Sequence, residues 1–98
     1  MPNNSIKAYL DNPISLKIDD NRLDFDSVKQ IAFKRAKELT PAPVLLAWYD
    51  RKTGRVVPQV ACARDDKPAW IVYAESRGGN IVIDINDEEY IFIYGSED

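Results

Sequence analysis

The sequence predicts an α+β fold in which one main helix packs on a mostly antiparallel sheet of about five to six strands. One long segment, residues 24–40, repeats its apolar side chains with helical spacing. Shorter segments rich in branched and aromatic residues follow it, separated by turn-forming residues. The chain has 98 residues, the size of one ordinary domain. We therefore expect residues 1–98 to form a single domain, with residues 1–5 and 96–98 frayed at its ends.

The main helix is expected to run from Asp24 to Thr40. Asp24 suits the capping position because its carboxylate can accept a hydrogen bond from an unpaired backbone N–H of the first turn. Pro41 and Pro43 follow the helix, and proline both lacks an amide hydrogen and restricts the residue before it. One face is apolar and is predicted to be buried, and it consists of Val28, Ile31, Ala32, Ala36 and Leu39.

The other elements are predicted to be strands joined by turns. Pro58 cannot donate to a sheet ladder, so its strand is expected to lie at an edge or to carry a bulge. Gly54, Gly78 and Gly79 are expected in hairpin turns that require a positive φ. Short connections favour antiparallel neighbours. The predicted strands are residues 14–18, 44–49, 55–60, 70–75, 81–85 and 90–94.

Composition excludes several classes of function. The chain contains no histidine, which removes histidine-dependent catalytic triads and histidine zinc sites. Cys62 is the only cysteine, so no intramolecular disulfide can form, and we expect this thiol to pack quietly rather than to react. The net charge of −3 argues against binding to nucleic acid. The basic face of the helix, Lys29, Lys34 and Lys37, is accordingly expected to be solvated.

The sequence gives no sign of a membrane or of secretion. The longest uninterrupted apolar run, residues 44–49, is far too short to span a bilayer. The first residues lack the basic and then apolar pattern of a secretory signal. We therefore expect a cytoplasmic protein that does not enter a membrane.

The acidic segment from Asp84 to Glu89 is the strongest candidate for a metal site. Hard cations need several oxygen ligands, and a turn can bring them together. The segment opens like a calcium loop, but Glu89 stands where that loop requires glycine. Similarly, the glycines of residues 77–80 could suggest a phosphate loop, but a strand-like segment follows them instead of a helix. We expect two ordinary turns, with no metal site, no cofactor and no catalytic residue.

Four segments resemble a family of small bacterial and archaeal proteins described as a domain of unknown function. They are Ala47-Trp48-Tyr49-Asp50, Lys67-Pro68-Ala69-Trp70, residues 73–79 and the closing segment Tyr90–Tyr94. The resemblance covers roughly residues 40–95. It implies a compact helix-plus-sheet domain, and it supplies neither an activity nor any functional residue.

The last predicted strand is apolar on both faces. Period-two geometry places Tyr90, Phe92 and Tyr94 on one face and Ile91 and Ile93 on the other. A single helix can cover only one of them, so the other must meet a crossing strand, a terminal segment, a second subunit or a ligand. We therefore expect an interaction module that self-associates through Tyr90, Phe92 and Tyr94, which would make the protein a homodimer.

A ligand-binding protein is the alternative. Trp48, Tyr49 and Trp70 could line a groove for a small molecule, although such residues more often belong to the core. A minor enzyme that uses carboxylates beside this groove is the catalytic form of the same idea. The missing histidine and the missing motifs favour the interaction module over an enzyme.

Overall fold

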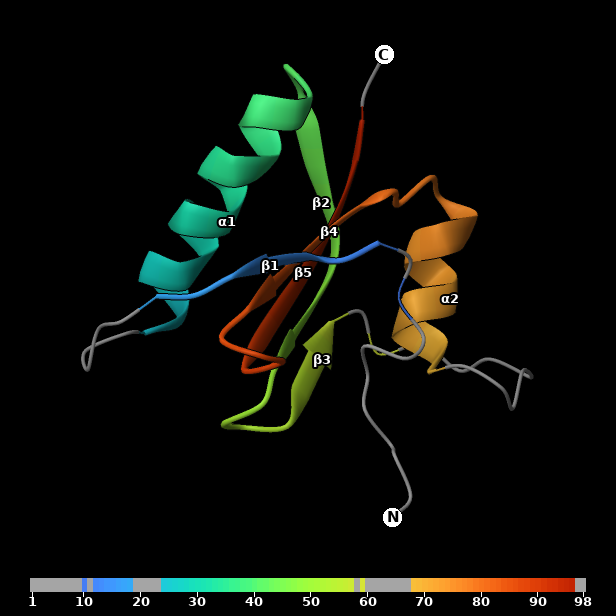
Figure 1. Cartoon of the computed structure of the whole chain (residues 1–98). Coiled ribbons are helices and arrows are strands. Elements are labelled where there is room, and N and C mark those ends of the chain that lie inside the picture. The colour runs from blue at the N-terminus through green and yellow to red at the C-terminus, as the bar shows by residue number, and fades with distance from the viewer. Residues whose placement is uncertain (1–9, 11, 19–23, 58, 60–67, 97–98) are drawn as a thin grey trace.

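The computed structural model describes residues 10, 12–18, 24–57, 59 and 68–96 (Figure 1). Within them the predicted α+β class is confirmed, although one element differs from the prediction. Ser96 ends the last strand, whereas the other terminal residues expected to fray lie outside the described residues. The elements, in chain order, are β1 (Ile14–Leu16), α1 (Phe25–Leu39), β2 (Pro43–Asp50), β3 (Arg55–Val57), α2 (Ala69–Ser76), β4 (Ile81–Ile85) and β5 (Tyr90–Ser96).

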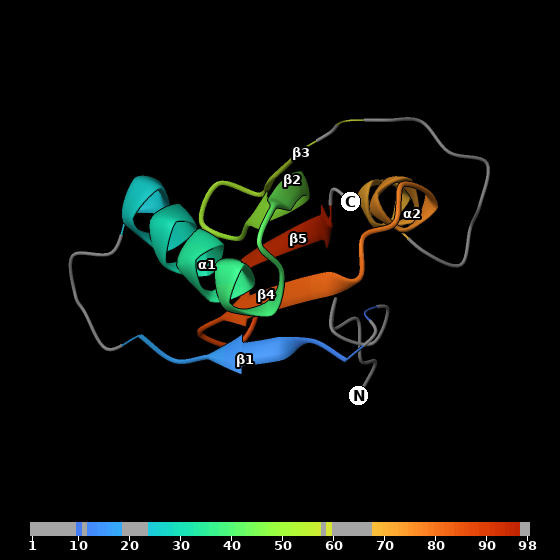
Figure 2. The ribbon, with the colours of Figure 1, turned by 90° about the horizontal axis from the view of Figure 1, so that it is seen from above.

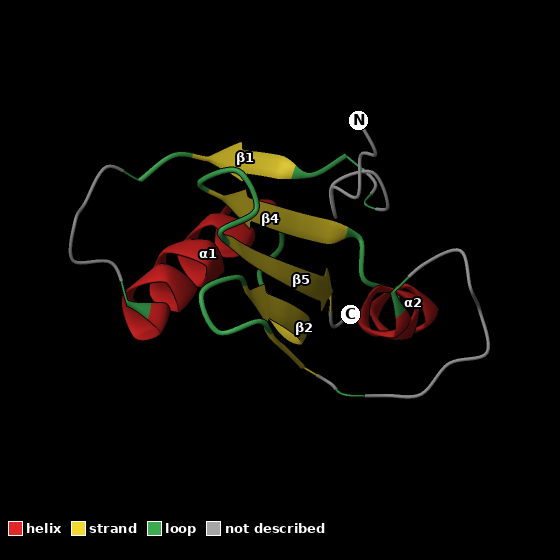
Figure 3. Ribbon diagram, turned by 90° about the horizontal axis from the view of Figure 1, so that it is seen from below, coloured by secondary structure: helices red, strands yellow, loops and turns green. Residues whose placement is uncertain are grey.

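The five strands form one mixed sheet in the order β1-β4-β5-β2-β3 (Figures 2 and 3). The pairs β4–β5, β5–β2 and β2–β3 are antiparallel, as the short turns predict. β1 instead runs parallel to β4. These two strands are distant in the sequence, so no tight turn forces them to be antiparallel. β3 lies at an edge, as expected, while Pro58 itself is outside the described residues.

α1 has the predicted limits and caps. The Asp24 carboxylate accepts a hydrogen bond from the Ser27 amide at 2.9 Å, and Thr40 closes the helix by donating its amide to Ala36. Val28, Ala32 and Ala36 are fully buried as predicted, because the sheet meets the helix along an i, i+4, i+8 stripe.

The predicted burial of two residues of this helix is wrong. Ile31 is 36% exposed and Leu39 is 49% exposed. Ile31 lies beside the narrow stripe rather than in it, and Leu39 lies in the last turn of α1.

The predicted strand at residues 70–75 is wrong, because this segment forms α2. Trp70, Ile71 and Ala74 are buried, a spacing that a helix places on one side. Branched and aromatic residues favour strands only weakly, and burial against the sheet overrides that preference here. None of the helices in the described part of the chain is long and apolar enough to cross a membrane.

Gly78 and Gly79 end this helix instead of forming the predicted hairpin turn. The Gly78 amide donates to the Glu75 carbonyl and the Gly79 amide donates to the Ala74 carbonyl, which is the Schellman arrangement. Gly78 has φ +84°, so the predicted positive φ is present. At Gly79 a Cβ atom would lie 2.8 Å from the Ala74 carbonyl oxygen and 2.8 Å from the Ile93 side chain. The chain therefore needs glycine at both positions, for different reasons.

Two separate cores fill the two sides of the sheet, and Figure 1 shows a helix on each side. The first lies between α1 and the sheet, and it contains Val28, Ala32, Ala36, Ile81, Ile83, Ile85, Tyr90, Phe92 and Tyr94. The second lies between α2 and the sheet, and it contains Ala47, Trp70, Ile71, Ala74, Val82, Ile91 and Ile93. The two apolar faces of β5 are thus both covered from within the chain.

β2 carries an irregularity that decides which of its side chains reach α1. Leu45 pairs with Tyr94 and Ala47 pairs with Ile93, so the register shifts at Leu46. As a result Leu45 and Trp48 pack against the first core, although they are three positions apart. An extra residue in one strand re-aims the side chains that follow it.

Candidate functional site

The predicted interface residues lie under α1. Tyr90, Phe92 and Tyr94 are 2%, 0% and 1% exposed. Phe25 packs on Phe92 with ring centroids 5.7 Å apart, and Phe33 packs on Tyr94 at 6.2 Å. The expectation of an uncovered aromatic face on β5 is therefore wrong, because α1 covers this face while α2 covers the other. Self-association stays a prediction, but this face is not available to support it.

The three predicted groove residues do not come together. Trp48 and Tyr49 are neighbours in β2 and so point to opposite faces of the sheet. Trp48 contacts Phe25 on the α1 side, with centroids 4.5 Å apart. Tyr49 stacks on Trp70 on the α2 side at 5.8 Å. Trp70 is only 5% exposed, so this stacked pair belongs largely to the second core.

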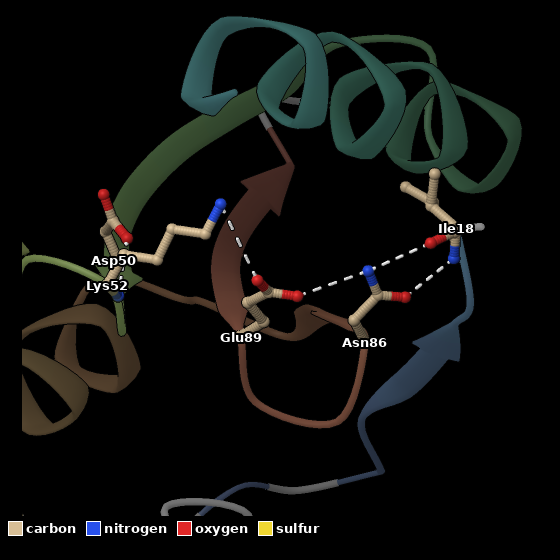
Figure 4. A network of polar contacts seen from close by, with 5 residues as sticks. All are labelled: Ile18, Asp50, Lys52, Asn86 and Glu89. Atoms are coloured by element: carbon tan, nitrogen blue, oxygen red, sulfur yellow. Dashed lines mark hydrogen bonds and ion pairs between the residues drawn. The ribbon is translucent and has the colours of Figure 1, made fainter. Parts of the chain in front are cut away.

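The acidic turn between β4 and β5 has a structural role. The Asn86 side chain accepts from the Ile18 amide and donates to the Ile18 carbonyl, so it extends the β1–β4 pairing past the end of the strands (Figure 4). Glu89 contacts Asn86 and lies 3.9 Å from the Lys52 ammonium. Asp84 is buried and accepts from the Glu88 amide. In the described residues no three acidic or sulfur side chains converge on a point that could hold a metal ion.

The glycine segment after α2 does not resemble an anion site. Its backbone amides are used by the carbonyls at the carboxyl end of α2. That end of a helix carries the partial negative charge, which disfavours phosphate. The Arg77 guanidinium lies over the Tyr73 ring, 4.5 Å from its centre. Cys62, the other candidate for chemistry, lies outside the described residues.

An apolar groove beside α1 is a site that sequence reasoning missed. Its volume is about 560 Å³. Leu45 and Tyr94 contribute to it from the sheet, and Phe33 contributes from the helix. Asp26, Lys29 and Gln30 supply its polar rim. All four helical residues come from one flank of α1, because Lys29, Gln30 and Phe33 follow Asp26 by three, four and seven positions.

Tyr94 is the distinctive residue of this groove. Its hydroxyl oxygen is buried and has no hydrogen-bond partner among the described residues. Burial raises the pKa of Tyr94 to about 12, so the hydroxyl stays protonated and can donate at neutral pH. A buried hydroxyl without a partner costs about 1–3 kcal/mol. A group that costs stability in this way at the edge of a groove marks a candidate binding site.

Two features of the fold position Tyr94 and its neighbours. The register shift in β2 turns Leu45 toward α1, directly opposite Tyr94 in the β2–β5 pair. The narrow contact stripe of α1 leaves Phe33 outside the core, 41% exposed, where it forms the wall of the groove. The Lys37 ammonium lies 5.9 Å from the centre of the Phe33 ring and adds a positive charge on the same flank.

The chemistry of the groove suits binding better than catalysis. Its polar groups are one protonated phenol, one amide, one carboxylate and a lysine. Its lining holds no thiol and no paired carboxylates, and Asp26 is exposed in the first turn of the helix. A general base needs a perturbed pKa and a position close to the reacting proton. The groove offers instead an apolar body formed by Phe33 and Leu45, with the buried Tyr94 side chain at its edge.

The sequence pattern of one protein family matches residues 11–94 of this chain. The chain belongs to the family described as domain of unknown function DUF5619. This confirms the resemblance noted in the sequence and extends it to the first strand and the helix. The family description supplies no activity, so the function is unknown.

A curated protein sequence and a solved structure, both from Archaeoglobus fulgidus, are similar to this member of DUF5619. One, called an uncharacterized protein, is 45% identical over 49 residues, which is 50% of this chain and 52% of that protein. The chain thus spans about half the length of this curated relative. The other is the crystal structure of a novel protein, AF1514, with a TM-score of 0.73 and 26% identity over 91% of this chain and 98% of that one. It supports the fold and carries no stated function.

One signal in the sequence could have revealed the groove. Phe33 lies at the border of the apolar stripe of the helix, too far round to reach the core. A large aromatic residue at such a border needs a second surface to contact. Its contact with Tyr94 depends on the crossing of helix and sheet and on the register of β2, and neither can be read from periodicity.

Proposed function

We propose that this protein is a small-molecule-binding domain whose site is the groove between α1 and the β2–β5 pair. The observation that carries the proposal is the buried Tyr94 hydroxyl, which has no partner among the described residues. A ligand that fills the groove can accept this hydrogen bond once the side chains that cover the hydroxyl shift, and it would then remove the cost of leaving the donor unpaired. We also propose that residues 1–98 form one domain and that it acts in the cytoplasm.

The dimensions of the groove support a ligand of modest size. Small-molecule sites in proteins are typically concave, mostly apolar and fitted with a few polar groups that fix orientation. A volume of about 560 Å³ falls in the ordinary range for such sites, roughly 300–1,000 Å³. Phe33 and Leu45 provide the apolar contacts, and the Tyr94 hydroxyl provides the orienting one.

Titration with naphthol, an aromatic probe that carries a single hydroxyl, tests this function. Amide NMR spectra of the intact protein should show saturable shifts at residues of the α1 flank and of β5. Tyr94→Phe should weaken binding by about fivefold, which is the value of one hydrogen bond. Tyr73→Phe is the matched control, because Tyr73 lies on α2 at the other side of the sheet.

The control variant should bind naphthol as the natural protein does. Shifts confined to other regions, or equal binding by Tyr94→Phe and the natural protein, would show that the groove is not the site. The absence of any saturable shift would also contradict the proposal, because a groove with a buried donor should accept such a probe.

Self-association is a second candidate, supported by an observation away from β5. The large apolar residues that remain exposed in the described part of the chain are Ile31, Phe33, Leu39 and Val44, all on α1 or just beyond it. Leu39 and Val44 lie at the corner where α1 turns into β2. Sedimentation velocity should show a concentration-dependent dimer that Leu39→Lys converts to a folded monomer. A monomer across the micromolar range would exclude this candidate.

A further inference from the structure

Resting on the proposed function, we infer that the groove selects a flat aromatic monoanion, such as a small aromatic carboxylate. Three features of the groove bear on the class of ligand: the shape of its walls, the hydrogen-bonding character of its buried polar group and the charge along its rim. Each points to one property of the ligand, and the three properties together define the class.

The walls favour a flat ring. The rings of Phe33 and Tyr94 lie 6.2 Å apart and are inclined to each other by 56°. The Phe33 ring is 41% exposed and offers its surface to a further aromatic ring, whereas the Tyr94 ring packed against it is 1% exposed. Leu45 adds an aliphatic contact from the neighbouring strand. A planar body would therefore touch Phe33 and Leu45, and it would reach the buried Tyr94 ring after a small shift of the Phe33 side chain.

The buried polar group requires an acceptor. Tyr94 stays protonated far above neutral pH, because burial raises its pKa to about 12. Its hydroxyl therefore offers an O–H, and a ligand matches it with a carbonyl or carboxylate oxygen. Hydrogen bonds to a charged acceptor are shorter and stronger than those to a neutral one. An oxygen of a carboxylate attached to the ring would satisfy this donor once the side chains that cover the hydroxyl shift to admit it.

The rim favours one negative charge. Lys29 borders the groove and Lys37 lies over the Phe33 ring, and both carry positive charge. Asp26 is the acidic residue of the rim. Two positive charges and one negative charge leave a net charge of +1 along this flank. Both lysines are exposed, so their attraction is modest and is screened by salt.

A set of four matched naphthalene probes tests the class on the intact protein. Naphthoate carries the anion and the acceptor, naphthamide carries a neutral acceptor, naphthylmethylammonium carries a cation, and naphthol serves as the reference for groove binding. At low salt naphthoate should bind about two- to fivefold more tightly than naphthamide. That advantage should shrink at high salt. The cation should bind most weakly.

Two lysine variants locate the effect. Lys29→Gln should reduce the advantage of naphthoate over naphthamide and leave naphthamide affinity unchanged. Lys34→Gln is the control, because Lys34 is also exposed on α1 but does not line the groove. It should leave both affinities unchanged.

The outcomes separate this inference from the proposed function. Equal affinity for naphthoate and naphthamide, or a preference for the cation, would overturn the anion preference while naphthol binding still supported the groove. An advantage of naphthoate that Lys34→Gln abolishes and Lys29→Gln does not would also overturn it. Failure of all four probes to bind would overturn the binding function and this inference together.

Discussion

Replacing Tyr94 with phenylalanine should stabilise the protein. The change removes one buried oxygen and keeps the ring, so the contact with Phe33 and the packing against the first core are retained. An unsatisfied buried hydroxyl costs about 1–3 kcal/mol, and its removal returns part of that cost. We expect a gain of about 1 kcal/mol in the free energy of unfolding. For a domain of this size that corresponds to a rise of roughly 4–8 °C in the melting temperature.

Urea denaturation followed by tryptophan fluorescence measures this gain, with thermal unfolding as a second readout. Tyr73→Phe is again the control, because its ring lies under the Arg77 guanidinium on α2 and the change should alter stability little. A loss of about 1 kcal/mol or more on Tyr94→Phe would refute the reasoning, since it would mean that the hydroxyl makes a stabilising hydrogen bond in the folded protein. The site would then lose the observation that defines it.

Three further predictions follow from the same structure. The advantage of Tyr94→Phe over the natural protein in free energy of unfolding should grow as pH rises from about 10 to 12, as measured by urea titration. The natural protein loses stability in this range because its folded form keeps the Tyr94 proton that the unfolded chain releases. A constant difference would contradict the raised pKa. Gly79→Ala should lower the free energy of unfolding by about 1–3 kcal/mol in the same urea assay, since the new Cβ meets the Ala74 carbonyl oxygen. An unchanged urea midpoint would contradict this close approach. Asp24→Ala should lower the thermal midpoint measured by circular dichroism, whereas Asp24→Ser should retain the cap. The Asp24 contribution should be lost as pH falls through its lowered pKa, and equal losses in the two variants would contradict a capping role.

The first helix and the strands β2, β4 and β5 could be predicted from the sequence because local signals determine them. Asp24 and Pro41 mark the limits of α1, and its apolar repeat is long enough to exclude a strand. β4 was predicted with its observed limits, since an isoleucine-rich run lies between turn formers. These signals depend only on neighbours in the chain, and tertiary packing agrees with them.

α2 could not be recognised in the same way. The eight residues of this helix are almost all apolar, so their pattern fits a helix and a strand equally well. Length is the criterion that remains, and a segment this short favours a strand. The glycines after it fit a helix cap as well as a hairpin turn. The evidence for a second covering element came instead from β5, which is apolar on both faces. Ile91 and Ile93 lie on one face, and Tyr90 and Phe92 lie on the other. Those faces required a second partner, and a second helix supplies it.

The candidate site shows a different limit of sequence reasoning. Tyr94 was identified as important because it belongs to an aromatic strand face, but the expected role was contact with another subunit. The structure buries the ring, and the unusual feature is the oxygen. Neither the burial of one atom nor the absence of a partner for it among the described residues follows from a period of two. Both depend on the angle at which α1 crosses the sheet.

A comparison within β5 indicates why the oxygen matters. Phe92 lies on the same face two residues before Tyr94, is fully buried and packs without a polar atom in its side chain. A phenyl ring is therefore compatible with this layer of the core, and the hydroxyl of Tyr94 is not needed to fill it. Natural sequences are locally consistent except where function requires otherwise. A donor that weakens the fold and borders a groove is explained by an occupant that accepts its hydrogen bond, and the stability of Tyr94→Phe and its affinity for naphthol should consequently change in opposite directions.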